Sequence, residues 1–294
     1  MIKLKRKNME IQNLNQTLKK IKEENYAILH ININNLEWAK FVLLATKQAN
    51  LDIILGASPS AIKYMGGYKT VVNLVNGLIQ DLEIKTNVIL HLDHGNYNDC
   101  INAINAGFKS IMYDGSKEDF ETNILNTKKI VNIAKKMDIT VEAEVGRIGL
   151  DISKNKSLDI QKTNIEDAKK LANTGIDLLA VAIGNIHGQY ESNWKGLDFE
   201  LLDKLNQEIK IPLVLHGASG IKEDDIKKAI RLGIKKINFN TELQIANAKA
   251  LNDFLKNNNF LENKNYNPRI LYANSNQAIY KCTLDLLNKY GKKN

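Results

Sequence analysis

The chain has 294 residues, of which 44% are hydrophobic and 25% charged, a composition typical of a globular protein with a sizeable core. Only two cysteines occur, Cys100 and Cys282, so neither a disulfide-stapled small protein nor a cysteine-ligated zinc site is indicated. No apolar run approaches the roughly 18 residues of a membrane span, and no apolar segment follows the basic N-terminus. We therefore expect a cytoplasmic protein that binds no membrane.

The formal net charge of +8 is compatible with nucleic acid, an anionic membrane or a small phosphorylated ligand. The lysines are scattered along the whole chain, without an Arg-rich block or interleaved aromatic residues. We interpret the charge mainly as a compositional bias toward lysine, with a small anionic substrate as the functional alternative, and we expect no nucleic-acid partner. Residues 1–8 are predicted to be a basic arm, and residues 9–294 a single domain.

Short apolar or β-branched runs alternate with longer stretches of helical periodicity. Eight runs predict strands, at residues 27–33, 52–55, 88–92, 110–113, 140–145, 178–183, 212–215 and 236–239. Strands that alternate with helices predict a parallel sheet, and eight such units favour an α/β fold of the (β/α)₈ TIM-barrel type over an open doubly wound sheet. Residues 272–290 predict an additional C-terminal helix.

Active sites of such barrels lie at the C-terminal ends of the strands, and histidines gather there in this sequence. Four of the five histidines lie at or near predicted strand ends, namely His91, His94, His187 and His216. Three imidazoles from the third, sixth and seventh strands, with no cysteine nearby, are typical of a catalytic zinc site with one open position. Asp93 precedes His94 and would point to the opposite side of the third strand unless that strand has ended.

Two further segments of small and polar residues precede predicted helices. Residues 216–220 (HGASG) lead into a helix that begins near Glu223, and residues 238–241 (NFNT) precede a helix from Glu242. Such segments let backbone N–H groups converge on an anion, and barrels commonly bind phosphate after strands 7 and 8. Thr241 with Gln244 also matches a capping box, so a simple helix N-cap is the alternative role for Thr241. Together the patterns predict a zinc site beside a phosphate site.

Five ordered motifs resemble the class II, zinc-dependent fructose-bisphosphate and tagatose-bisphosphate aldolases, over nearly the whole chain from about Met9. They are HLDHG, VEAEVG, GNIHGQY, LVLHGASG and INFNTE, at residues 91–95, 141–146, 184–190, 213–220 and 237–242. The resemblance implies a glycolytic enzyme that reversibly cleaves fructose 1,6-bisphosphate to dihydroxyacetone phosphate and glyceraldehyde 3-phosphate. Tagatose 1,6-bisphosphate, which differs in configuration at C4, is the alternative substrate.

The resemblance also implies residue roles around the metal. His94, His187 and His216 would hold Zn²⁺, which would act as a Lewis acid on the ketone. Asp93 would remove and return the proton of the C4 hydroxyl. Two carboxylates match positions that hold a second or displaced metal in some members of the family, namely Asp114 and Glu144.

The resemblance also implies which residues contact the substrate. The dihydroxyacetone phosphate half would contact Gly188, Gly217, Ala218, Ser219, Asn238, Phe239, Asn240 and Thr241. A monovalent cation, Na⁺ or K⁺, would lie beside its phosphate. Asn32 and Ser58 would face the substrate, and Arg269 would bind the distal phosphate in a neighbouring subunit's site. Members of the family are commonly dimers or tetramers, so the resemblance also implies a homo-oligomer.

One segment departs from the family pattern. Residues 146–163, after the fifth strand, are polar and without periodicity, which is typical of a functional or mobile loop. The family has a Gly-Gly turn here, followed by acidic residues, one of which exchanges the proton at C1 of dihydroxyacetone phosphate. This chain has Leu150 in place of one glycine, and no glutamate stands in the expected place. Either Asp151 substitutes in a working aldolase, or the chain is a catalytically impaired relative that binds zinc and phosphosugar.

Overall fold

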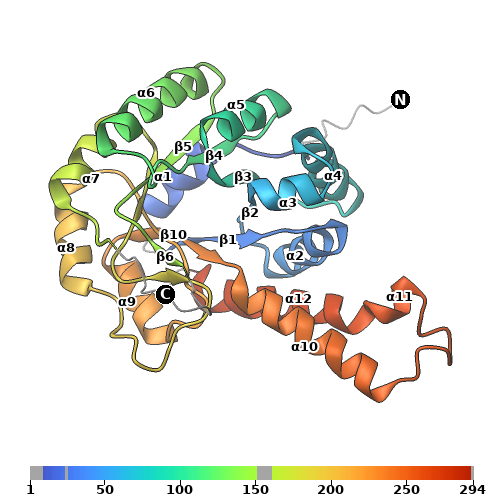
Figure 1. The fold of residues 1–294 in the computed structure, drawn as a ribbon. Helices are drawn as coiled ribbons and strands as arrows, with labels where there is room; N and C mark the ends of the chain where they lie inside the picture. The colour runs from blue at the N-terminus through green and yellow to red at the C-terminus, as the bar shows by residue number, and fades with distance from the viewer. Residues whose placement is uncertain (1–8, 24–25, 151–160, 293–294) are drawn as a thin grey trace.

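Eight parallel strands close into a barrel in this computed structural model, which describes residues 9–23, 26–150 and 161–292 (Figure 1). Their order around the barrel is β1-β10-β9-β7-β5-β4-β3-β2. The strands are β1 (Ile28–Asn32), β2 (Ile53–Ala57), β3 (Val88–Gly95), β4 (Ser110–Tyr113), β5 (Thr140–Val145), β7 (Leu178–Val181), β9 (Leu213–Leu215) and β10 (Ile234–Phe239). The predicted TIM barrel is confirmed, and each predicted strand overlaps one of these eight.

Helices surround the barrel and bury one apolar face each against it (Figure 1). They are α2 (Leu36–Ala49), α3 (Pro59–Tyr64), α4 (Tyr68–Asp81), α5 (Tyr97–Ala106), α6 (Phe120–Lys136), α7 (Ile165–Ala172), α8 (Phe199–Glu208) and α9 (Glu223–Arg231). Local signals set their ends. Asn96 and Asp99 form a capping box at the start of α5, and Gly107 ends that helix with φ 108°, a conformation that glycine adopts without strain.

A helix that the sequence analysis did not predict closes the N-terminal end of the barrel. This helix is α1 (Asn15–Glu23), and in Figure 1 it lies within the ring of outer helices. Leu18 and Ile21 lie on one face of α1, Leu14 directly precedes the helix, and all three side chains are buried. They pack in one apolar cluster with side chains that point into the barrel, namely Ile28, Ile54, Ile89, Met112, Leu178, Ala180 and Val214. We call this cluster the barrel floor.

The C-terminal helices form an arm that projects from the barrel (Figure 1). The arm consists of α10 (Thr241–Asn257), α11 (Pro268–Leu271) and α12 (Ala273–Tyr290). The predicted C-terminal helix is therefore present, and it packs against α2 and α10. Several large apolar side chains of the arm are exposed to solvent, namely Ile245, Leu255, Phe260, Leu261, Tyr266, Ile270 and Tyr272.

A small second sheet lies outside the barrel sheet. It pairs β6 (Gly149–Leu150) with β8 (Ile186–His187) in parallel, and an isolated bridge joins Arg147 to Gln161 nearby. The expectation of an irregular segment over residues 146–163 is therefore wrong at Gly149–Leu150. Asp151 and the basic arm at residues 1–8 lie outside the described residues.

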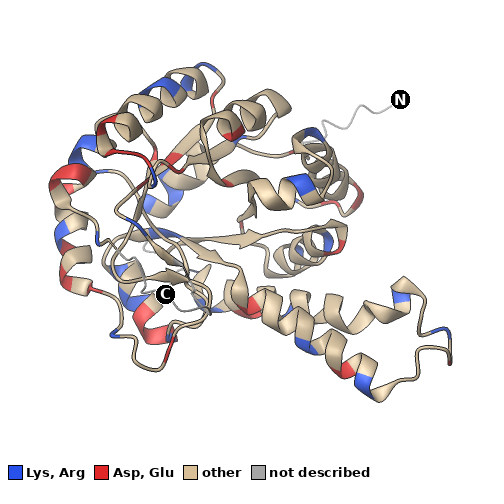
Figure 2. Ribbon diagram, in the orientation of Figure 1, with Lys and Arg blue, Asp and Glu red and all other residues tan. Residues whose placement is uncertain are grey.

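Charged residues are distributed over the outer helices, with basic and acidic segments side by side (Figure 2). Pairs such as Lys227–Glu223, at 2.7 Å on α9, follow the spacing of one helical turn. None of the helices in the described ranges is long and apolar enough to cross a membrane.

Candidate active site

A cavity of about 770 Å³ lies at the C-terminal ends of the barrel strands, which we call the barrel mouth. Most of the side chains that the sequence analysis proposed meet there, although they come from strands far apart in the chain. The predicted residues that line it are Asn32, Ser58, Asp93, His94, Asp114, Glu144, His187, Gly188, His216, Gly217, Ser219, Asn238, Asn240 and Thr241.

Three histidines converge on one point of this cavity. His94 comes from β3, His187 from β8, and His216 directly follows β9. Their ring centroids lie 4.8 to 5.8 Å apart, and the planes of each pair are 71° to 86° from parallel. Nε2 of His94 is 3.1 Å from Nδ1 of His216, close to the roughly 3.3 Å that separates two nitrogens bound to one tetrahedral zinc ion. One potential ligand atom from each histidine lies within 4.8 Å of those of the other two.

An irregularity in β3 brings Asp93 and His94 to the same cavity. In a regular strand, consecutive side chains point to opposite faces. Here the pairing of β3 with β4 shifts register between Leu92 and Gly95, and His94 has φ 53° in the left-handed region. A non-glycine residue in this conformation bears some strain, which is common at functional sites. Both side chains therefore line the barrel mouth, whereas simple alternation predicts that they separate.

Asp93 is buried and has one oxygen without a partner. Its Oδ2 accepts a hydrogen bond of 2.8 Å from Nδ2 of Asn32, whereas Oδ1 has no hydrogen-bond partner. Burial alone would raise the pKa of this carboxyl. Interaction with His30, His94 and His216 in their protonated forms, and with Lys236, outweighs burial and holds the pKa well below its ordinary value. Asp93 is thus a carboxylate with one oxygen available as a base.

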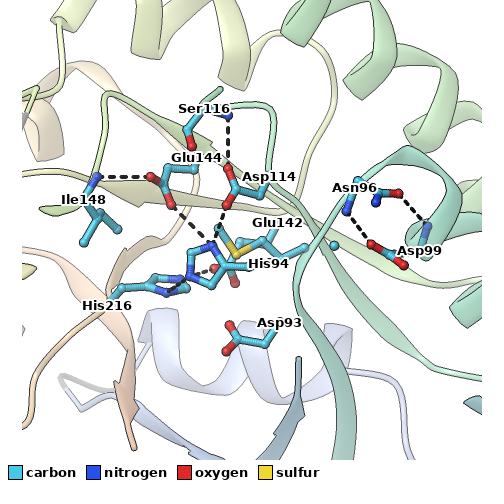
Figure 3. A network of polar contacts seen from close by, with 12 residues as sticks. Asp93, His94, Asn96, Asp99, Asp114, Ser116, Glu142, Glu144, Ile148 and His216 are labelled. Atoms are coloured by element: carbon cyan, nitrogen blue, oxygen red, sulfur yellow. Dashed lines mark hydrogen bonds and ion pairs between the residues drawn. The ribbon is translucent and has the colours of Figure 1, made fainter. Parts of the chain in front are cut away.

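A second group of potential ligands shares His94 (Figure 3). Nδ1 of His94 lies 2.8 Å from Oδ2 of Asp114 and 3.9 Å from Oε2 of Glu144. Ligand atoms of these three residues also lie within 4.8 Å of one another. Burial raises the pKa of the Glu144 carboxyl to about 8. At His94 burial lowers the pKa, but the neighbouring carboxylates outweigh it and raise the pKa of this imidazole to about 10. The site therefore offers two adjacent positions that could each hold a cation.

His216 is oriented by partners on both sides of its ring. Nε2 lies 2.8 Å from Oε1 of Glu142, and Nδ1 lies 3.2 Å from Nδ2 of Asn238. Because an amide nitrogen donates and a carboxylate accepts, this network assigns the proton to Nε2 and leaves Nδ1 as an acceptor. Nδ1 is also the atom that faces His94.

Small residues next to His187 and His216 bring backbone close to the cavity. Gly188 has φ 109° and Gly217 has φ 65°. A Cβ on Gly217 would lie 1.9 Å from the carbonyl oxygen of Ile186, so no larger residue fits without movement of the backbone. Oγ of Ser219 accepts hydrogen bonds from the N–H groups of Asn240 and Glu242, which ties this segment to the start of α10.

Comparisons with known proteins agree with this geometry. The family model described as "Fructose-bisphosphate aldolase class-II" matches residues 12–294. A Mycoplasma genitalium protein named fructose-bisphosphate aldolase is 47% identical, with 96% of this chain and 98% of that protein covered. A Ureaplasma parvum protein of the same name is 48% identical, with 92% and 94% covered. The chain belongs to the class II fructose-bisphosphate aldolase family.

A solved structure supports the same assignment. The crystal structure of the YdjI aldolase from Escherichia coli K12 superimposes with a TM-score of 0.80 at 30% identity, and covers 96% of this chain and 98% of that one. Class II aldolases are metal-dependent lyases that act on phosphosugars, and the histidine cluster of this chain could hold such a metal.

Three residues matched to the aldolase pattern do not line the cavity. Ala218 is fully buried, and its N–H donates to the carbonyl oxygen of Asn238. Phe239 stacks on Tyr290 in the core at a centroid distance of 5.7 Å, because it follows the inward-facing Asn238 on β10. Arg269 is exposed on α11, in the arm.

The start of α10 also differs from its prediction. The helix begins at Thr241 rather than Glu242, and Asn240 is its N-cap residue. The side chain of Asn240 makes no capping hydrogen bond. The hydroxyl oxygen of Ser219 accepts from the N–H of Glu242 instead. The capping box of Thr241 and Gln244 is therefore wrong, since Thr241 lies inside the helix.

Five further residues line the cavity and were not among the proposed site residues: Asn34, Ser116, Lys117, Arg147 and Ile148. Among the described residues that line the cavity, Lys117 is the one lysine and Arg147 is the one arginine. Nη2 of Arg147 donates to the carbonyl oxygen of Ser116, so the segments after β4 and β5 are linked. Their position directly after strand ends was the available signal, because that is where barrel loops form active sites.

Proposed function

We propose that the barrel mouth reversibly cleaves fructose 1,6-bisphosphate to dihydroxyacetone phosphate and glyceraldehyde 3-phosphate with Zn²⁺ as the metal, in glycolysis and in the cytoplasm. The observation that carries the proposal is the convergence of His94, His187 and His216 with the unpartnered oxygen of Asp93 in one cavity. Three imidazoles and an open position are the donor set of catalytic zinc. We also propose that residues 9–294 form a single domain.

The residues present fit a metal ion. His94, His187 and His216 would hold Zn²⁺, and Asp114 and Glu144 together with His94 would hold a second or displaced ion. When bound, the metal supplies Lewis-acid polarisation of the ketone and stabilises the negative charge that develops as the C3–C4 bond breaks. Nδ1 of His216 and Nε2 of His94 already face one another, so little rearrangement of these rings is required.

Asp93 would act as the base toward the C4 hydroxyl in cleavage and return the proton in condensation. Its low pKa keeps it ionised at neutral pH, as the first step of cleavage requires. Asn32 donates to Oδ2 and thereby leaves Oδ1 toward the cavity. Asn32 is therefore proposed to position the base as well as to face the substrate.

The two phosphoryl groups would bind on opposite sides of the three-histidine cluster. Gly188, Gly217 and Ser219, with the start of α10, would hold the phosphate of the dihydroxyacetone phosphate half, with Na⁺ or K⁺ beside it. In the order of strands around the barrel, β4 lies across from β9 and β10. Lys117, which follows β4, would therefore meet the distal phosphate, and Arg147, which is hydrogen-bonded to the neighbouring Ser116, would assist it.

A homo-oligomer, dimer or tetramer, is proposed on the basis of the arm. Arg269 is exposed there, beside large apolar side chains that are exposed to solvent in the monomer. In an oligomer, Arg269 would reach the distal phosphate in a neighbouring subunit's site. Light scattering at micromolar concentration should give at least twice the chain mass of 33.2 kDa, and a mass near 33.2 kDa would contradict this proposal.

The test of the proposed function is the release of triose phosphate from fructose 1,6-bisphosphate by metal-free protein, by zinc-loaded protein and in the presence of a chelator. Zinc-dependent turnover is expected. The same series on tagatose 1,6-bisphosphate compares the rate of cleavage of the alternative substrate with that of fructose 1,6-bisphosphate. Stoichiometric zinc binding without cleavage of either sugar would instead support the impaired relative. That outcome would implicate the missing loop glutamate, whose proposed substitute is Asp151.

A further inference from the structure

A group of ionisable side chains lies inside the barrel, directly below the mouth. Glu142 on β5 and Lys236 on β10 are both fully buried, and Nζ of Lys236 lies 2.8 Å from Oε2 of Glu142. His91 on β3 and His30 on β1 are also fully buried, with ring centroids 5.4 Å apart. In the proposed reaction none of these four side chains contacts the substrate or binds the metal.

Such a pair is not explained by stability alone. Removing a carboxylate and an ammonium from water costs several kcal/mol per ion, and apolar residues of similar volume are often as stable or more so. The floor one layer lower shows that this barrel interior accepts apolar residues, since Ile54, Ile89 and Val214 are fully buried there. What lies directly above the Glu142–Lys236 pair gives it a role beyond stability.

The two oxygens of Glu142 have different partners. Oε2 faces Lys236, and Oε1 accepts the Nε2–H of His216 at 2.8 Å. The same carboxylate thus joins the buried ammonium to a proposed metal ligand. His91 does not substitute for Lys236, because its Nε2 is 3.9 Å from Oε2 and its Nδ1 binds Oγ of Ser110 at 2.8 Å.

We propose that Lys236 is a positioning residue of the metal site. It anchors the carboxylate of Glu142, and Glu142 in turn holds the imidazole of His216 with the proton on Nε2 and with Nδ1 toward the metal. Partners that orient a metal-binding histidine in this way typically change metal affinity by about 10- to 100-fold when removed. The inference rests on the proposed function only in that His216 binds the metal.

The test compares zinc release from the holoenzyme to an excess of a chromogenic chelator. In Lys236→Met, which keeps most of the apolar stem and removes the ammonium, zinc release is expected to be about 10 to 100 times faster than in the unaltered protein. The matched control is Lys235→Met, the adjacent and half-buried lysine of β10. It should release zinc at the unaltered rate. Wild-type release from Lys236→Met would overturn the proposal.

A double variant separates positioning from charge compensation. Lys236→Met leaves the Glu142 carboxylate buried without its counter-ion, which by itself can destabilise the fold. Lys236→Met with Glu142→Gln removes both charges and keeps the volume. If Lys236 positions the ligand, the double variant regains thermal stability and still releases zinc at least tenfold faster than the unaltered protein. Recovery of stability together with a normal zinc release rate would show a purely structural role and overturn the proposal.

The measurement also separates this inference from the proposed function. Zinc release needs no substrate, so a protein that binds zinc but cleaves no bisphosphate overturns only the proposed function. An unaltered protein that binds no zinc overturns both. A second readout is the ¹⁵N spectrum of the His216 ring in the metal-free protein. The Nε2–H form should predominate in the unaltered chain and mix with the Nδ1–H form in Lys236→Met; an unchanged spectrum would count against positioning.

Discussion

The two ends of the barrel interior differ in almost every property, although the same strands form both. At the floor, the inward positions of four strands carry Ile28, Ile54, Ile89 and Val214. At the mouth, the same strands or the residues directly after them carry Asn32, Ser58, Asp93 and His216. The floor is covered by α1, whereas the mouth is a cavity lined by polar side chains. The fold thus places its stability and its chemistry at opposite ends of one set of strands.

The energetics of the two ends differ as well. Each large apolar side chain of the floor contributes about 1.5–3 kcal/mol through burial. At the mouth, Oδ1 of Asp93, Oε2 of Glu144 and Oδ1 of Asn238 are buried without a hydrogen-bond partner. Such groups cost stability unless a ligand meets them. Substitutions at the mouth should therefore change binding and rate, whereas substitutions at the floor should change stability.

The largest effect on rate is expected from Asp93→Asn, which keeps the shape of the side chain and removes the base. Cleavage of fructose 1,6-bisphosphate should fall by about 10²- to 10⁴-fold, the usual contribution of a general base. Zinc content should remain that of the unaltered protein. Asp253→Asn, on the exposed surface of α10, is the control and should be fully active. Wild-type turnover by Asp93→Asn would exclude Asp93 as the base.

The largest effect on stability is expected at the floor, from Leu178→Ala. This side chain is fully buried in the cluster that α1 closes. Its truncation should lower the free energy of unfolding by about 2–5 kcal/mol in urea denaturation, with zinc affinity unchanged. Leu125→Ala is the control, because Leu125 is 53% exposed on α6. The separation of the two ends would fail if Leu178→Ala also weakened zinc binding at a temperature where it is folded.

A smaller loss of stability is expected from Gly56→Ala, in the layer between floor and mouth. A Cβ at Gly56 would lie 1.5 Å from Nε2 of the buried His30, so the ring must move. Overpacking of this kind costs about 1–3 kcal/mol, which thermal unfolding measures. Gly77→Ala on α4 is the control, since its Cβ would meet nothing within 4 Å. It should be neutral or slightly stabilising. Equal stability of both variants would contradict this packing.

The smallest effect is expected from Lys117→Met at the rim of the mouth. Loss of one charged contact to the distal phosphate should raise KM for fructose 1,6-bisphosphate about tenfold, equivalent to ~1.4 kcal/mol. KM for fructose 1-phosphate, which lacks that phosphate, should not change. Lys129→Met on the exposed side of α6 serves as the control. An equal rise in KM for both sugars would show that Lys117 does not meet the distal phosphate.

The barrel was predictable because each strand carries a local signal. Residues 110–113 and 140–145 were predicted with the observed ends, and the other predicted strands overlap β1, β2, β3, β7, β9 and β10. The apolar spacing of Leu14, Leu18 and Ile21 is also visible in the sequence. The local sequence does not indicate, however, that this helix closes one end of a barrel. The pairing of Gly149 with Ile186 in β6 and β8 depends on contacts between distant segments, so periodicity did not reveal it.

The site was predictable in its residues and not in its geometry. The order of the histidines along the chain indicated the metal site. Strand alternation, however, placed Asp93 and His94 on opposite faces, and only the register shift beside Gly95 brings them together. Lys236 and Glu142 are far apart in the sequence and meet because the barrel closes. Such a pair carries no local sequence signal.

The central claim is that the mouth binds zinc through three histidines, with His216 held from the layer below. Diffraction data collected on both sides of the zinc absorption edge, from crystals of the zinc-loaded protein, test it most directly. We predict an anomalous difference peak within bonding distance of His94, His187 and Nδ1 of His216, with Nε2 of His216 facing Glu142. A peak away from these three histidines, or a His216 ring turned to bind through Nε2, would contradict the account.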